Sequence, residues 1–293
     1  VSNKFGADIL RLWALSSDYS MDVNLSDDIL KGISDVYRKI RNTARYILGN
    51  TYDYDPEKPV AYEDLQEIDK WALTRLNKLI KDCTKDYDTY SFGNCYHDVN
   101  QFCVVDMSSF YLDIIKDRLY TEKADSVARR AAQTTMYYIL DALVKILTPM
   151  ISFTAEEIWS AMNHTEKENV ESPMLADYPV PNDEWDNKEI AEKWEKIINV
   201  MAVVGLLILG IFITVPCCLD IPYLLSNNLV EVTGEVTQGA MSGENSNSER
   251  RIHIRDEKTG EEHSLKYWGT GSDLGDKITV RYLPHTEYGY VVE

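Results

Sequence analysis

Apolar residues recur three and four positions apart through most of the first 200 residues, the spacing that places them on one face of an α-helix. The pattern predicts helices over 27–48, 68–87, 94–120 and 125–147, a shorter one after Thr154, and a last one from about Asn187 onward. Ser26 is suited to cap the first helix and Gly49 to end it, and Thr154 with Glu157 forms a T-x-x-E capping box. Together these segments predict an antiparallel helical bundle.

The pattern changes abruptly at Val200. Val200–Leu219 is a run of twenty residues without a charged side chain. At about 1.5 Å per residue, a helix of this length spans about 30 Å, the hydrocarbon thickness of a bilayer. We therefore predict a transmembrane helix over 200–220, with a buried core helix that breaks at Pro216 as the alternative.

Beyond Asn228, apolar and polar residues alternate, as they do in β-strands with one buried face. The alternation covers about five short segments, separated by turn sequences at Thr259-Gly260 and Gly275-Asp276 and by a polar loop over Gln238–Glu249. This predicts a small β-barrel domain over 229–293. The expected fold class is thus a helical bundle, then a transmembrane helix and a separate small β domain.

Four segments carry a characteristic sequence as well as a periodicity: FGADILRLWALSSDYSMDV (Phe5–Val23), ISDVYRKIRNTARYILGN (Ile33–Asn50), DMSSFYLDIIKDRLY (Asp106–Tyr120) and LTPMISFTAEEIW (Leu147–Trp159). In this order they resemble isoleucyl-tRNA synthetases of class I. The first resembles the segment after the signature lysine loop of the catalytic domain, and the others resemble the anticodon-binding bundle. The resemblance covers about residues 1–200. It implies a linker from the catalytic domain over 1–25 and an anticodon-binding bundle over 26–199, in the cytoplasm.

The catalytic motifs of that family do not occur in this sequence. It has neither a HIGH-type nor a KMSKS-type motif, and no phosphate-binding glycine loop. The five cysteines lack C-x-x-C spacing and the five histidines lack ligand spacing, so we predict no catalytic residue, metal or cofactor. The resemblance implies a module that holds isoleucine-accepting tRNA for a catalytic domain absent from this chain. ATP and Mg²⁺ would belong to the full family enzyme.

The formal net charge is −18, with 23 basic and 35 acidic residues up to position 200 and 7 and 13 beyond it. A polyanionic partner therefore needs a local basic surface. The predicted helix 27–48 offers one, because no acidic residue occurs between Val36 and Tyr52. Guanidinium groups spaced along a helix suit successive phosphates. The candidate tRNA contacts are Arg38, Lys39, Arg41, Asn42 and Arg45, together with Lys116 and Arg118 in the third helix. A solvated basic face is the alternative for the first group, and an internal ion pair for Arg118.

The second part of the chain departs from the synthetase pattern, which continues after the bundle with polar helices and often a zinc-binding module. Its segment GDKITVRYLP (Gly275–Pro284) loosely resembles small β-domains of membrane-anchored bacterial proteins. A genuine fusion, a gene-model artefact and a family member with an unusual tail all stay open as explanations. Two alternative functions follow: a membrane-anchored interaction protein with an external β-domain and membrane contact through Val200–Leu219, or a non-functional fusion.

Overall fold

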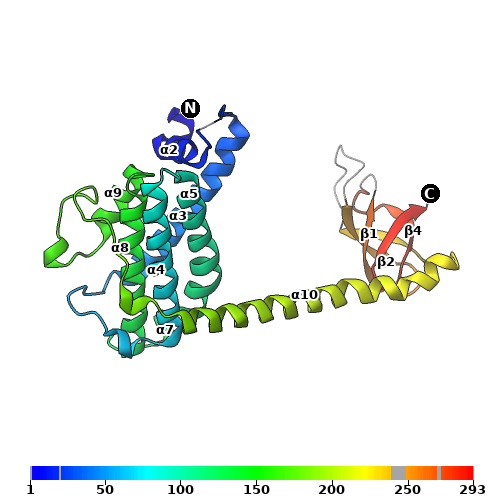
Figure 1. Ribbon diagram of the computed structural model, residues 1–293. Coiled ribbons are helices and arrows are strands. Elements are labelled where there is room, and N and C mark those ends of the chain that lie inside the picture. The colour runs from blue at the N-terminus through cyan, green and yellow to red at the C-terminus, as the bar shows by residue number, and fades with distance from the viewer. Residues whose placement is uncertain (1, 20, 239–248, 269–271, 293) are drawn as a thin grey trace. The chain divides into compact units, whose positions relative to one another are not determined.

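A computed structural model describes residues 2–19, 21–238, 249–268 and 272–292 (Figure 1). The chain divides into two compact units, Val1–Ile197 and Ile198–Glu293. The first unit is helical. The second holds most of one long helix and a five-stranded sheet.

The predicted helical bundle is confirmed in the first unit. Its helices are α1 (Ser2–Phe5), α2 (Ala7–Ser16), α3 (Asp27–Thr51), α4 (Glu67–Asp88), α5 (Phe92–Gln101), α6 (Leu112–Ile114), α7 (Lys116–Thr121), α8 (Val127–Leu147), α9 (Ser152–Ala161) and the start of α10 (Lys188–Leu225). A π-helical segment, Phe102–Tyr111, joins α5 to α6, and 3-10 turns lie at Tyr62–Asp64, Glu166–Glu168 and Asp183–Trp185. Helices α3, α4, α5 and α8 pack side by side (Figure 1).

Helix α3 begins as predicted and ends later than predicted. The Ser26 hydroxyl accepts a hydrogen bond from the Ile29 amide at 3.2 Å, which satisfies a free N–H at the helix start. Gly49 does not end the helix, because another half turn follows and buries Thr51 on the core face. The predicted single helix over 94–120 is also wrong in detail, since the π-helical segment interrupts its regular hydrogen bonding.

The capping box predicted at Thr154 is wrong. Helix α9 already begins at Ser152, and its first amide groups are satisfied by Asp8 in α2. One Asp8 carboxylate oxygen accepts from the Thr154 amide at 2.8 Å and hydroxyl at 2.6 Å, and the other accepts from the Phe153 amide at 3.3 Å. A carboxylate is favoured there by the unpaired amides and by the helix dipole. Helix α2 is therefore fastened to the bundle.

Helix α8 lies at the centre of the bundle, in keeping with its sequence, in which only Asp141 and Lys145 are charged from Met136 to Leu147. Between Ala131 and Leu147 every residue is buried except Tyr138 and Asp141, which are half-buried. Its buried Lys145 is paired with Asp141 at 2.8 Å and with Glu168 from a later turn. These ion pairs explain how a lysine is accommodated in the core.

Helix α10 runs unbroken through Pro216 and Pro222, so the alternative of a helix that breaks at Pro216 is wrong. It is long and apolar enough to cross a membrane by length and composition, and none of its most apolar stretch is buried. A buried core helix therefore does not describe this segment. Whether it crosses a bilayer stays a prediction, because length and composition alone do not decide it.

The sheet of the second unit contains β1 (Val230–Gln238), β2 (Glu249–Asp256), β3 (Glu262–Trp268), β4 (Lys277–Tyr282) and β5 (Tyr288–Val292). The strand order is β1-β2-β3-β5-β4, and β4 pairs back with β1, so the sheet closes on itself. The apolar positions of the alternating pattern form its core: Val232, Ile252, Ile254, Leu265, Tyr267, Val280 and Tyr282. The predicted turns are confirmed, with Gly260 (φ 73°) and Gly275 (φ 88°) in left-handed conformations. The loop predicted over Gln238–Glu249 falls mostly on 239–248, outside the described residues.

Asp220, near the end of α10, joins this helix to the closed sheet. Its side chain is 1% exposed. It accepts hydrogen bonds from the His285 amide at 3.1 Å, the Thr286 amide at 2.8 Å and the Thr286 hydroxyl at 2.6 Å. The His285 ring nitrogen Nδ1 lies 2.9 Å from the same carboxylate. The turn between β4 and β5 is thus bound to α10, and we call these three residues the latch.

Candidate functional site

The five candidate residues of α3 form one exposed surface, here called the α3 stripe: Arg38, Lys39, Arg41, Asn42 and Arg45. The opposite face of the same helix buries Ile40, Ala44 and Ile47, which fixes the direction in which the stripe points. The structure therefore brings these candidates together as the sequence predicted.

The stripe divides by electrostatic environment. Arg38 is paired with Asp35 on its own helix. One Arg41 nitrogen donates to both Glu157 carboxylate oxygens of α9, at 2.7 and 3.0 Å, and this contact raises the pKa of Arg41 above its ordinary value. Within the described part of the chain, Lys39 and Arg45 have no carboxylate within 4 Å. These two cations are therefore the ones available to a phosphate without breaking an ion pair.

A shallow cavity of about 380 Å³ adjoins the stripe, between the C-terminal half of α3 and α9. Arg41, Arg45 and Glu157 supply its polar lining, and Leu48, Ile158 and Ala161 supply its apolar lining. A cation beside an apolar floor is the combination that suits a phosphate with its attached sugar or base. The sequence predicted the arginines but not this floor, because α9 contributes Ile158 and Ala161 from a distant part of the chain.

The second group of candidates separates in the structure. Lys116 is exposed and paired at 2.5 Å with Asp113, one turn earlier. Arg118 instead lies inside the unit, with its side chain 14% exposed, and donates to both oxygens of Asp69 at 2.6 and 2.8 Å. The Tyr111 hydroxyl donates to the same carboxylate at 2.8 Å. The structure thus shows the alternative given for Arg118, an internal ion pair, and its partner is Asp69 of the neighbouring helix α4.

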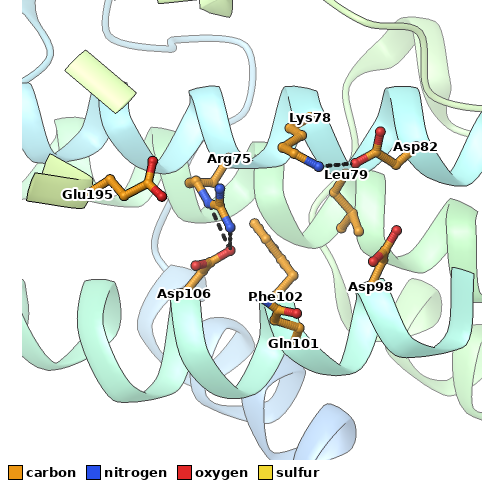
Figure 2. Close-up of a pocket in the computed structure, with 9 residues that line it drawn as sticks. All are labelled: Arg75, Lys78, Leu79, Asp82, Asp98, Gln101, Phe102, Asp106 and Glu195. Atoms are coloured by element: carbon orange, nitrogen blue, oxygen red, sulfur yellow. Dashed lines mark hydrogen bonds and ion pairs between the residues drawn. The ribbon is translucent and has the colours of Figure 1, made fainter. Parts of the chain in front are cut away.

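A polar pocket of about 310 Å³ lies between α4 and the π-helical segment (Figure 2). Arg75 reaches across it to Asp106, with Nε and one terminal nitrogen 3.0 and 2.9 Å from the same oxygen. Burial raises the pKa of Asp106 and the Arg75 charge opposes that rise. Sequence analysis missed this pair, because residues on different helices leave no spacing signal.

The far end of the pocket is acidic. Asp82 and Asp98 project into it from α4 and α5, and Lys78 contacts Asp82 (Figure 2). Burial first, and then the negative charge of Asp82, raises the pKa of Asp98. The four carboxylates and two cations of this pocket do not suit a polyanion. Among the described residues, no group of three or more His, Cys, Asp or Glu side chains could hold a metal ion.

Comparison with known proteins gives the helical unit its family. Residues 69–207 match the family described as the anticodon-binding domain of tRNA ligase. This part of the chain is an anticodon-binding domain of the tRNA ligase kind. Lys116 and Arg118 lie inside the matched range, whereas the α3 stripe lies before it.

The curated relatives of this anticodon-binding domain are isoleucine–tRNA ligases. That of Caldanaerobacter subterraneus subsp. tengcongensis is 57% identical over 201 residues, which are 68% of this chain and 22% of the relative. That of Thermoanaerobacter sp. (strain X514) is 52% identical over 201 residues, with the same two shares. The chain thus spans about a fifth of the length of these relatives. The match to a solved LeuRS–tRNA–LeuAMS complex from Agrobacterium radiobacter K84 covers 64% of this chain and 21% of that chain, at 17% identity and a TM-score of 0.48.

Proposed function

We propose that the helical unit binds tRNA as the anticodon-binding module of an isoleucine–tRNA ligase. The observation that carries this proposal is the match of 69–207 to the anticodon-binding family, together with 57% identity to an isoleucine–tRNA ligase over 201 residues. The partner would be the anticodon stem and loop of isoleucine-accepting tRNA. The steps that use ATP, Mg²⁺ and isoleucine would take place in a catalytic domain that this chain does not contain, and the module would act in the cytoplasm.

The α3 stripe supports the proposal because it supplies what RNA binding needs in an acidic protein. Its cations are clustered on one exposed helix face, where Lys39 and Arg45 meet no carboxylate among the described residues. The Asn42 amide between them can donate to a base edge or a phosphate. Phosphate contacts of this kind release counterions, so the affinity must fall as the salt concentration rises.

The test is tRNA binding by the full chain in detergent, measured across a salt series. Isoleucine-accepting tRNA should bind more tightly than an unrelated tRNA, and Arg45→Gln should reduce the salt slope by about one contact. Lys167→Gln, which removes a cation from the 3-10 turn Glu166–Glu168 far along the chain from the stripe, serves as the matched control. Equal affinity for all tRNAs, or an unchanged slope in Arg45→Gln, would contradict the proposal.

We further propose that α10 anchors the chain in a membrane through 200–220, with the closed sheet as a small β-barrel domain outside it. The supporting observation is that this apolar stretch stays helical through Pro216 and that its most apolar part is not buried. Lys188, Lys193 and Lys196 precede it, and no Lys or Arg follows until Arg250, which favours a cytoplasmic N-terminus. Resistance to carbonate extraction tests the anchor, and recovery in the soluble fraction would contradict it. Continuous genomic reads across codons 195–205 would test whether the fusion is genuine.

A further inference from the structure

The closed sheet carries a basic surface in an acidic unit. Ile252 and Ile254 of β2 are fully buried, so the alternate positions Arg251, His253 and Arg255 point away from the core. Among the described residues, neither Arg251 nor Arg255 has a carboxylate within 4 Å. By contrast, Arg281 on β4 is paired with Glu231 at 2.8 Å. Arg255 lies opposite Glu235 of β1 and Glu262 of β3, which offset its charge, whereas Arg251 lies opposite a lysine. The positive charge that lacks a facing carboxylate is therefore at the Arg251 end of β2.

Strand register extends this surface across three strands. Arg251 lies opposite Lys266 of β3, and Lys266 lies opposite Tyr288 of β5. The Lys266 ammonium group is 5.2 Å from the centre of the Tyr288 ring. We call Arg251, Lys266 and Tyr288 the outer patch. Two cations beside a tyrosine ring form the combination that sits in the headgroup layer of a bilayer.

The latch places the outer patch close to the end of the apolar helix. Thr286, which binds Asp220, is two residues before Tyr288 in β5. Two residues of extended chain cover about 7 Å, and neighbouring strands lie about 5 Å apart. The two patch cations therefore lie within about 20 Å of Asp220. The uncharged run ends at Leu219, directly before that residue.

We propose that the closed sheet docks through its outer patch onto an anionic bilayer surface, at the end of the membrane span formed by α10. This inference rests on the proposed membrane anchor and adds a partner for the sheet. The latch limits how far the sheet can turn away from the surface. Arg251 and Lys266 then lie against lipid phosphates, and removing both should weaken docking by about 30-fold.

The test uses the full chain reconstituted in vesicles, with Tyr290 replaced by a fluorescent aromatic residue. Tyr290 is 47% exposed and points to the same side of β5 as Tyr288. Lipids with a nitroxide on the headgroup should quench the label more strongly with 30% phosphatidylglycerol than in pure phosphatidylcholine. The difference should disappear at about 1 M salt, where the screening length is about 3 Å.

Two charge variants decide the outcome. Arg251→Gln with Lys266→Gln should abolish the lipid-dependent quenching. Lys258→Gln with Lys277→Gln, which removes the same charge at sites outside the patch, should preserve it. Quenching that is independent of lipid charge, or that persists in the patch variant, would overturn the docking proposal and leave the membrane-anchor proposal intact. Release of the chain by carbonate would overturn both. Loss of binding to a single-stranded oligonucleotide in the patch variant, with unchanged quenching, would assign the surface to nucleic acid instead.

Discussion

Replacing Arg118 with alanine should destabilise the helical unit by about 3–5 kcal/mol, because it leaves a buried carboxylate without its cation. The side chain of Asp69 is 0% exposed and is bound by Arg118 at 2.6 and 2.8 Å. The Tyr111 hydroxyl at 2.8 Å and the Gln66 amide at 3.3 Å would remain. Two neutral donors do not offset the desolvation of a full charge in the protein interior.

Urea unfolding followed by the helical circular dichroism signal measures this loss. With a slope of about 2 kcal/mol per molar urea, the midpoint should fall by about 2 M. Lys116→Ala provides the matched control, since its ion pair with Asp113 is on the surface and contributes at most about 1 kcal/mol. The double variant Arg118→Met, Asp69→Asn removes both buried charges and should recover much of the loss.

The Arg118→Ala variant also distinguishes the structural role of Arg118 from the phosphate contact that the sequence suggested for it. In folded Arg118→Ala, the salt slope of tRNA binding should equal that of the parent chain. If the unfolding midpoint is unchanged and the slope falls by about one, the reasoning from the buried ion pair is refuted.

Three further predictions concern single carboxylates. Asp8→Ala should lower the thermal stability of the helical unit by about 1–3 kcal/mol through the lost cap of α9, and an unchanged melting temperature would contradict this. The raised pKa of Asp98 means that stability falls as pH rises through that pKa. Asp98→Asn should therefore be more stable by up to about 0.5 kcal/mol at neutral pH but not in acid, and an equal gain at all pH would count against it. Glu157→Gln should release Arg41 and tighten tRNA binding about threefold, whereas weaker binding would show that the pair orients the arginine.

Local signals in the sequence account for the parts of the fold that could be predicted. The Ser26 cap, the buried face of α3 and the buried length of α8 each depend on residues within one helix. The turn at Gly260 likewise depends on a single left-handed residue between two strands. Such features need no knowledge of the neighbouring elements, so periodicity and capping rules find them.

Contacts between segments far apart in the sequence account for most of the predictions that were wrong or incomplete. The T-x-x-E motif at Thr154 is present, but Asp8, 146 residues away, takes the capping role. Arg118 finds Asp69 at a separation of 49 residues, and Arg75 finds Asp106 at 31. In the π-helical segment the buried residues Cys103, Met107 and Tyr111 are four positions apart, a spacing that also occurs in an ordinary helix. Neither these long-range contacts nor the π-helical geometry leaves a pattern that a single sequence reveals.

The candidate tRNA-binding residues differ in whether they are already paired with a carboxylate of the protein. Arg118 is committed to the interior, Arg38 and Arg41 hold surface carboxylates, and Lys39 and Arg45 hold none among the described residues. A surface ion pair contributes at most about 1 kcal/mol and weakens further in salt. The pair with Glu157 therefore weakens phosphate binding by Arg41 but does not prevent it. Phosphate binding on the α3 stripe should therefore begin at Lys39 and Arg45. Each cation that binds a phosphate adds about one to the salt slope, so the slope measures how many cations of the stripe the RNA contacts.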